Sequence, residues 1–124
     1  MLHYAFENLD VWKVSRKLVT SVYRLLQSFP SMEKYGLADQ LRRAVISVPS
    51  NIAEGSGRFG AKEKLHFIEY SYGSLMEVYC QLILACDLKY IDEENLTDIK
   101  NLIDSISLML NGMRKHQLQQ LNKN

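Results

Sequence analysis

Apolar side chains recur at three- and four-residue steps along nearly the whole of this chain. From Leu65 to Cys86 this spacing continues without a break. The period matches one face of an α-helix, whereas a half-buried strand alternates at every second residue. Only two prolines and six glycines interrupt the 124 residues, and no strand-like alternation is bounded by turn residues. The sequence therefore predicts an all-α fold.

Four helices are predicted, separated by three short connections. The helices are expected over residues 8–29, 36–57, 61–90 and 92–115. Short connections make successive helices antiparallel neighbours. We expect a single domain, an antiparallel up-down-up-down four-helix bundle over residues 1–118, followed by a frayed polar tail at 119–124. Pro49 lies inside the second helix and is predicted to kink or restart it, because proline lacks a backbone donor and crowds the carbonyl of Val45.

The third predicted helix carries more apolar surface than one contact face requires. A second stripe runs beside the first, and Ile46 and Ala53 lie off the main stripe of the preceding helix. A helix that is apolar on most of its circumference must be covered on more than one side. We therefore expect a ring-shaped homo-oligomer. A monomer with a deeply placed third helix is the alternative.

Charge is unevenly distributed along a nearly neutral chain. Lys and Arg number 15 against 14 Asp and Glu, a net charge of +1, which is a weak signal for a nucleic-acid-binding domain. Residues 1–62 nevertheless hold nine cations against five anions, and residues 63–124 hold six against nine. One basic face can attract phosphate even in such a chain, although an ordinary solvated surface is the alternative. The candidate phosphate contacts are Lys13, Arg16, Lys17, Arg24, Arg42, Arg43, Arg58 and Lys62.

No motif in the sequence predicts catalysis or metal binding. Glu63 and His66 form one E-x-x-H pair, but bundle di-iron sites need two such pairs and further glutamates. Cys80 and Cys86 are expected about 9 Å apart along one helix, too far for a disulfide, and are read as reduced core thiols. The glycine-rich stretch 55–60 follows no strand, so a turn is favoured over a phosphate cradle. We expect no enzymatic activity, no cofactor and no metal.

Asn51 and Glu54 on the second helix, with Ser71, Ser74 and Glu77 on the third, predict a structural hydrogen-bond network. Small side chains such as Gly73, Ser74 and Ala53 let helix backbones approach closely, and a covered carboxylate beside them must be paired. Arg42 and Arg43 are the nearest candidate partners. A polar ligand site and simple exposure remain as alternatives.

Two further signals bear on location. The first ten residues contain Glu7 and Asp10 and lack the apolar core of a signal peptide. No uncharged stretch approaches the roughly 20 apolar residues of a membrane span. A cytoplasmic protein without membrane contact is expected.

Five segments carry a resemblance to a known family. They are FENLDVW at 6–12, YGL at 35–37, QLRRA at 40–44, SVPSNIAEG at 47–55 and GSLME at 73–77. Together they resemble the four-helix-bundle proteins encoded in intervening sequences of bacterial 23S ribosomal RNA genes, over roughly Phe6 to Met113. The residues of this chain that match the family's motif positions include Arg42, Arg43 and the structural residues Pro49, Asn51, Glu54, Gly55, Gly73, Ser74 and Glu77.

The resemblance implies a homopentamer around a central channel. It also implies kinship with the accessory proteins of diversity-generating retroelements, which engage a reverse transcriptase and nucleic acid through basic surfaces. The chain departs from the family's pattern at 69–72, where Glu, Tyr, Ser and Tyr stand in place of basic and small residues. Our leading hypothesis is a non-enzymatic oligomer that binds RNA without base readout. The alternative is a protein scaffold or an accessory subunit, for example of a reverse transcriptase or a ribosome-associated partner.

Overall fold

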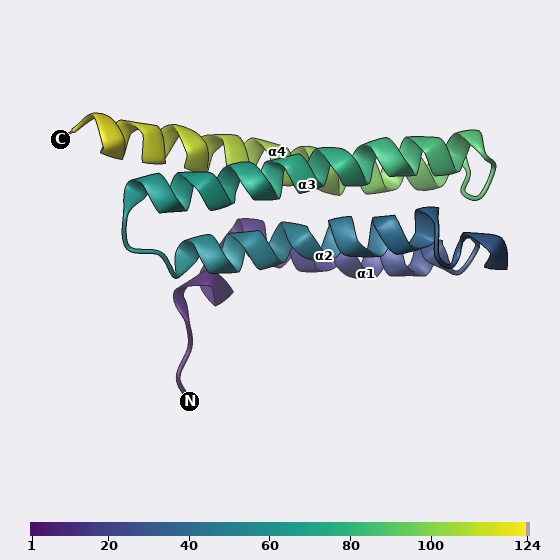
Figure 1. Ribbon diagram of the computed structural model, residues 1–124, viewed down its shortest axis with the longest axis horizontal. Helices are drawn as coiled ribbons and strands as arrows, with labels where there is room; N and C mark the ends of the chain where they lie inside the picture. The colour runs from purple at the N-terminus through teal and green to yellow at the C-terminus, as the bar shows by residue number, and fades with distance from the viewer. Residues whose placement is uncertain (124) are drawn as a thin grey trace.

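The computed structural model describes residues 1–123 and consists of four long helices (Figure 1). No strand occurs among these residues, which confirms the predicted all-α class and agrees with a four-helix bundle. Short 3₁₀ helices precede the first two long helices. The elements are η1 (Ala5–Asn8), α1 (Asp10–Leu26), η2 (Ser31–Glu33), α2 (Leu37–Ser56), α3 (Ala61–Asp87) and α4 (Glu93–Asn122).

Each long helix packs against two others. Contacts join α1 to α2, α2 to α3, α3 to α4 and α4 back to α1, and Figure 1 shows the helices side by side along one long axis. Three polar contacts show how α2 meets α3. From one contact to the next, the residue number on α2 rises while the residue number on α3 falls. These contacts are Gln81 to Gln40 at 3.2 Å, Ser47 to Ser74 at 2.8 Å and Lys64 to Ser56 at 3.3 Å.

The core lies between the four helices and is built from the main apolar stripe of each. Its largest side chains are fully buried, and burying one such Leu or Ile stabilises the fold by about 1.5–3 kcal/mol. They are Leu18, Leu41, Leu75, Leu82, Ile103, Ile106 and Leu110. No helix within residues 1–123 combines the length and the apolar character needed to cross a membrane.

Part of the second stripe of α3 is covered within the same chain. Ser71, Val78 and Ala85 are buried, and the Ser71 hydroxyl donates to the backbone carbonyl of Val48 at 2.9 Å. A single copy therefore already covers α3 from more than one direction, because α3 contacts both α2 and α4. The apolar residues that stay exposed on α3 form a different set, described below.

The ends of the helices differ from the predicted boundaries. The third helix ends at Asp87 rather than at 90, because Lys89 adopts a left-handed backbone with φ of 66°. The backbone N–H groups of Lys89 and Tyr90 then donate to Cys86 and Ala85, which closes the helix end. The fourth helix continues to Asn122, so the segment at 119–124 predicted to fray is helical over 119–122. Residue 124 lies outside the described residues.

The structure narrows one prediction about α2 and corrects one about α3. Of the kink or restart predicted at Pro49, the restart does not occur, since α2 is continuous from Leu37 to Ser56. The lost backbone bond is outweighed by packing, because Val45 and Val48 beside it are fully buried. Cys80 is exposed rather than in the core, since it lies on the outer side of α3.

Candidate nucleic-acid interface

A row of cations occupies the outer side of α1. Lys13, Lys17 and Arg24 follow one another at helical spacing, opposite the buried Val11 and Leu18, and all three are exposed. None of the three forms an ion pair within residues 1–123. Their charge is therefore available to an anionic partner.

Arg16 is held beside this row by aromatic packing. Its guanidinium lies 5.0 Å from the centre of the Trp12 ring, and Trp12 in turn meets the ring of Phe6 edge-on at 4.9 Å. Glu7 and Asp10 are the carboxylates at this end of α1, and the pKa of Glu7 is lowered chiefly because it accepts a hydrogen bond from the backbone of Tyr4. Arg16 thus has a fixed position close to the persistent negative charge of Glu7.

Arg42 and Arg43 are engaged by Asp39 rather than by Glu54 or Glu77. Arg42 is half-buried and donates to the carbonyl of Lys34 at 2.9 Å and to Asp39 at 3.4 Å. Arg43 is exposed and pairs with Asp39 at 3.0 Å. The hydrogen bond from Arg43 is the main reason that the pKa of Asp39 lies below its usual value. These two arginines mainly stabilise the first turns of α2.

Arg58 and Lys62 lie at the turn between α2 and α3, and both are exposed without an ion pair within the described chain. The Arg58 guanidinium stands 4.8 Å from the centre of the Phe67 ring. Lys64 extends the cationic group and donates to the carbonyl of Ser56 at the end of α2. The structure therefore divides the predicted cations between the α1 row, the α2–α3 turn and the Asp39 pairs.

A polar network lies between α2 and α3 as predicted, but it connects fewer of the predicted residues. The Asn51 amide donates to the carbonyl and the hydroxyl of Ser47, both at 2.8 Å. The Ser47 hydroxyl meets that of Ser74 at 2.8 Å. Glu54 is exposed, and Glu77 accepts a hydrogen bond from Gln81 at 3.3 Å.

The close helix approach occurs at Gly55 and not at Gly73. A Cβ atom on Gly55 would lie 2.8 Å from the Cβ of Phe67, so only glycine fits between α2 and α3 there. Gly73 is exposed, and a Cβ on it would meet nothing within 4 Å. The reading of Gly73 as a contact residue was wrong because it lies on the outer side of α3.

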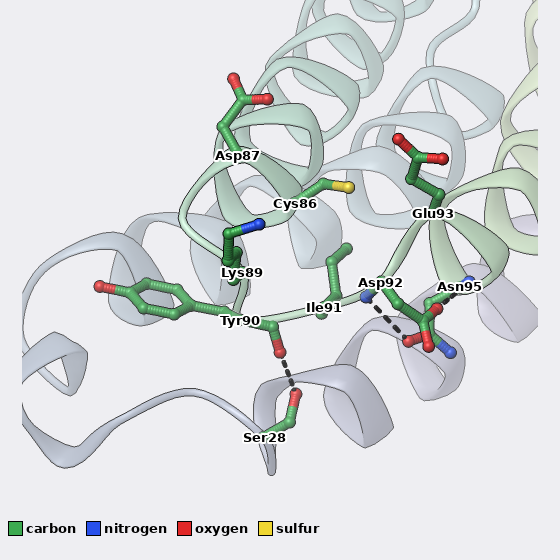
Figure 2. A pocket seen from close by; sticks show the side chains of 9 residues that line it. All are labelled: Ser28, Cys86, Asp87, Lys89, Tyr90, Ile91, Asp92, Glu93 and Asn95. Carbon is green, nitrogen blue, oxygen red and sulfur yellow. Dashed lines mark hydrogen bonds between the residues drawn. The ribbon is translucent and has the colours of Figure 1, made fainter.

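A broad surface hollow lies at the opposite end of the molecule, around the α3–α4 turn (Figure 2). Its volume is about 760 Å³. Ser28 donates to the carbonyl of Tyr90 at 2.7 Å, and Asp92 accepts from the backbone of Asn95 at 2.7 Å. Three carboxylates and one lysine line it, which disfavours a phosphate ligand. These charged residues are Asp87, Asp92, Glu93 and Lys89.

The other chemical candidates are simple surface groups. Glu63 and His66 are both exposed, and no cluster of three potential metal ligands occurs within residues 1–123. Sequence reasoning missed two exposed aromatic side chains near the α2–α3 turn, Phe59 and Tyr70. A phenylalanine inside a short glycine-rich turn was the available signal.

Comparison with known proteins gives a family and a fold. The family model described as 23S rRNA-intervening sequence protein matches residues 7–112. No curated protein matches the sequence. The fold is similar to the crystal structure of a protein with unknown function from the S23 ribosomal protein family of Bacteroides thetaiotaomicron, with a TM-score of 0.78 and 19% identity. That similarity covers 85% of this chain and 98% of the other.

Proposed function

Because the chain belongs to the 23S rRNA-intervening sequence protein family, we propose that it is a non-enzymatic cytoplasmic protein that binds RNA by contacting the phosphates of the RNA backbone. The observation that carries this proposal is that six of the predicted cations are exposed and form no ion pair within residues 1–123. They are Lys13, Arg16, Lys17, Arg24, Arg58 and Lys62.

Phosphate contacts of this kind carry no sequence information. Binding would gain its free energy from the counterions that the cations release from RNA, so the affinity should fall steeply between about 50 and 200 mM salt. Arg16 would contribute from its position on Trp12. Arg42 and Arg43 would contribute less, because Asp39 already neutralises part of their charge.

Filter binding of a structured RNA at low salt tests the proposal. We expect retention at micromolar protein, and we expect the Lys13→Gln/Lys17→Gln double variant to bind more weakly with a shallower salt dependence. The matched control is Lys100→Gln, because Lys100 is already paired with Asp104 at 3.0 Å. Absence of retention by the wild-type protein would remove the RNA-binding function.

We further propose that antiparallel bundles assemble into a ring, with five copies as the family resemblance implies. Two unlike exposed surfaces support this. The outer face of α3 is apolar with acidic neighbours, and it consists of Met76, Cys80, Ile83, Leu84 and Leu88 with Glu69, Glu77 and Asp87. The α1–α2 groove has a volume of about 400 Å³ and is lined by Trp12, Arg16, Val19, Thr20, Ile46, Pro49, Ser50 and Ala53.

A protein scaffold or accessory subunit is the second candidate function, and the outer face of α3 favours it, since exposed apolar patches mark protein interfaces. Recovery of partners from the native host, with and without nuclease, separates the two functions. Nuclease should abolish recovery if RNA is the partner. Recovery should survive nuclease if another protein occupies the α3 face.

A further inference from the structure

The region around the α2–α3 turn combines cations with exposed aromatic rings, and we infer that it binds unpaired RNA bases by stacking. This inference rests on the proposed RNA binding and names the form of RNA preferred. We call the group the stacking strip. Its members are Arg58, Phe59, Lys62, His66, Phe67 and Tyr70.

Phe59 is the outermost member of the strip. Its exposed fraction is 103%, so no part of the chain covers its ring. The turn that carries it is hydrogen-bonded on both sides, since the Arg58 backbone donates to Gly55 and the Lys64 backbone donates to Gly60. The ring is therefore presented from an ordered turn, with its faces open to a ligand.

The other members form a connected line along the start of α3. Arg58 lies over the ring of Phe67, and Phe67 meets Tyr70 edge-on with centres 5.7 Å apart. The His66 ring lies 6.4 Å from that of Tyr70. Tyr70 itself is 58% exposed. Lys62, His66 and Tyr70 follow one another at four-residue steps on this face of α3. The line from Lys62 to Tyr70 is therefore about 12 Å long along the helix axis.

This composition fits a single strand better than a duplex. Proteins that bind unpaired strands combine a cationic track with aromatic side chains on which successive bases stack. In a duplex the bases stack on one another, and extruding one costs a few kcal/mol. The neighbouring carboxylates are Glu54, Glu63 and Glu69, and Arg114 lies 3.6 Å from the last of these. Arg58 and Lys62 remain available for phosphate.

Fluorescence anisotropy with a labelled RNA of about 12 nucleotides, free or annealed to its complement, tests the inference. Phe59→Ala should weaken binding of the free strand by about tenfold and leave binding of the duplex within about twofold, and Tyr70→Ala should act in the same direction. Arg58→Gln should reduce the salt slope by about one for both forms.

Tyr35→Ala is the matched control. Tyr35 is 86% exposed and has Lys34 at 5.5 Å from its ring centre, but it lies just before α2, away from the strip. We expect no change in this variant. An equal loss in Tyr35→Ala and Phe59→Ala would overturn the inference.

The remaining outcomes separate the inference from the function on which it rests. If the wild-type protein binds neither RNA form, the proposed function fails, and the inference fails with it. If the wild type binds and Phe59→Ala weakens neither form, or both equally, only the inference fails. A lower mass of Phe59→Ala in light scattering would instead make Phe59 a contact between copies, which also overturns it.

Discussion

Gly55 shows how one residue determines the distance between two helices. It is buried in the last turns of α2, facing Phe67 of α3. The same sequence contains Gly73 in the middle of α3, where the space beside it is open. The sequence predicted the close approach at Gly73 and a turn from Gly55 onward, and only the packing shows that the close approach is at Gly55.

Gly55→Ala should therefore lower the free energy of unfolding, by about 1–3 kcal/mol, because the added methyl group overpacks the α2–α3 contact. Gly73→Ala should raise it by about 0.5–1 kcal/mol, because alanine restricts the unfolded chain and favours the helix. Urea denaturation followed by circular dichroism measures both. Equal effects of the two substitutions would contradict the assigned packing.

Tyr90 and Glu33 join the two turns at one end of the molecule. The Tyr90 hydroxyl donates to Glu33 at 2.7 Å, while the other carboxylate oxygen of Glu33 accepts from the backbone of Leu37 at 3.2 Å. This hydrogen bond is the main cause of a pKa of Tyr90 above its ordinary value of 10.0.

A group whose pKa is raised in the folded state contributes stability below its unfolded pKa and loses it as the pH rises through the folded value. We expect the wild-type protein to lose stability above pH 10 as Tyr90 ionises, and Tyr90→Phe to lack that component. Urea midpoints of the two proteins compared from pH 8 to pH 11 test this. A wild-type-to-variant difference that stays constant over that range would refute the contribution.

At the scale of whole elements, α4 begins with a capping box. The Asp92 carboxylate accepts from the backbone of Asn95 at 2.7 Å, and the Asn95 side chain accepts from the backbone of Asp92 at 3.3 Å. Asp92→Ala should cost about 1 kcal/mol of stability. Thr97→Ala, an exposed site one turn later, should stay within about 0.5 kcal/mol of the wild type. Thermal unfolding compares the two variants.

The helices could be predicted from the sequence because their apolar period is long and unbroken. The ends of the helices were harder to predict. The residue that closes α3 in a left-handed conformation is Lys89, whereas the sequence signal for such a position is a glycine. The sequence also left open whether the helix restarts at Pro49, and the helix continues because tertiary packing overrides local propensity. The candidate cations could be found from spacing on α1. The pairing of Arg42 and Arg43 with Asp39 depends on side-chain geometry, which spacing does not determine.

The whole molecule carries different chemistry at its two ends. The hollow at the α3–α4 turn is lined by Asp87, Asp92 and Glu93 (Figure 2), whereas the α2–α3 turn presents Arg58 and Lys62. An RNA strand is therefore expected to approach the second end.

Mixing two assembly variants tests whether unlike surfaces meet in the proposed ring. Ile46→Glu places a charge in the α1–α2 groove, and Leu84→Asp places one on the outer face of α3. Each variant alone should be monomeric, but the mixture should form a one-to-one complex, because each retains the surface that the other has lost. Light scattering measures the masses. Variants that remain monomeric when mixed would exclude this head-to-tail contact, and a monomeric wild type would exclude the ring.

Residues 1 and 123, the two ends of the described chain, lie at the end of the molecule that carries the α2–α3 turn (Figure 1). A purification tag or fluorescent fusion on either terminus would therefore be tethered at the same end as the α2–α3 turn, where it would compete with RNA for access to that turn. A polyhistidine tag would add imidazoles there, and an acidic solubility tag would repel nucleic acid. Comparing tagged and tag-free protein is thus a necessary first step in any measurement of binding.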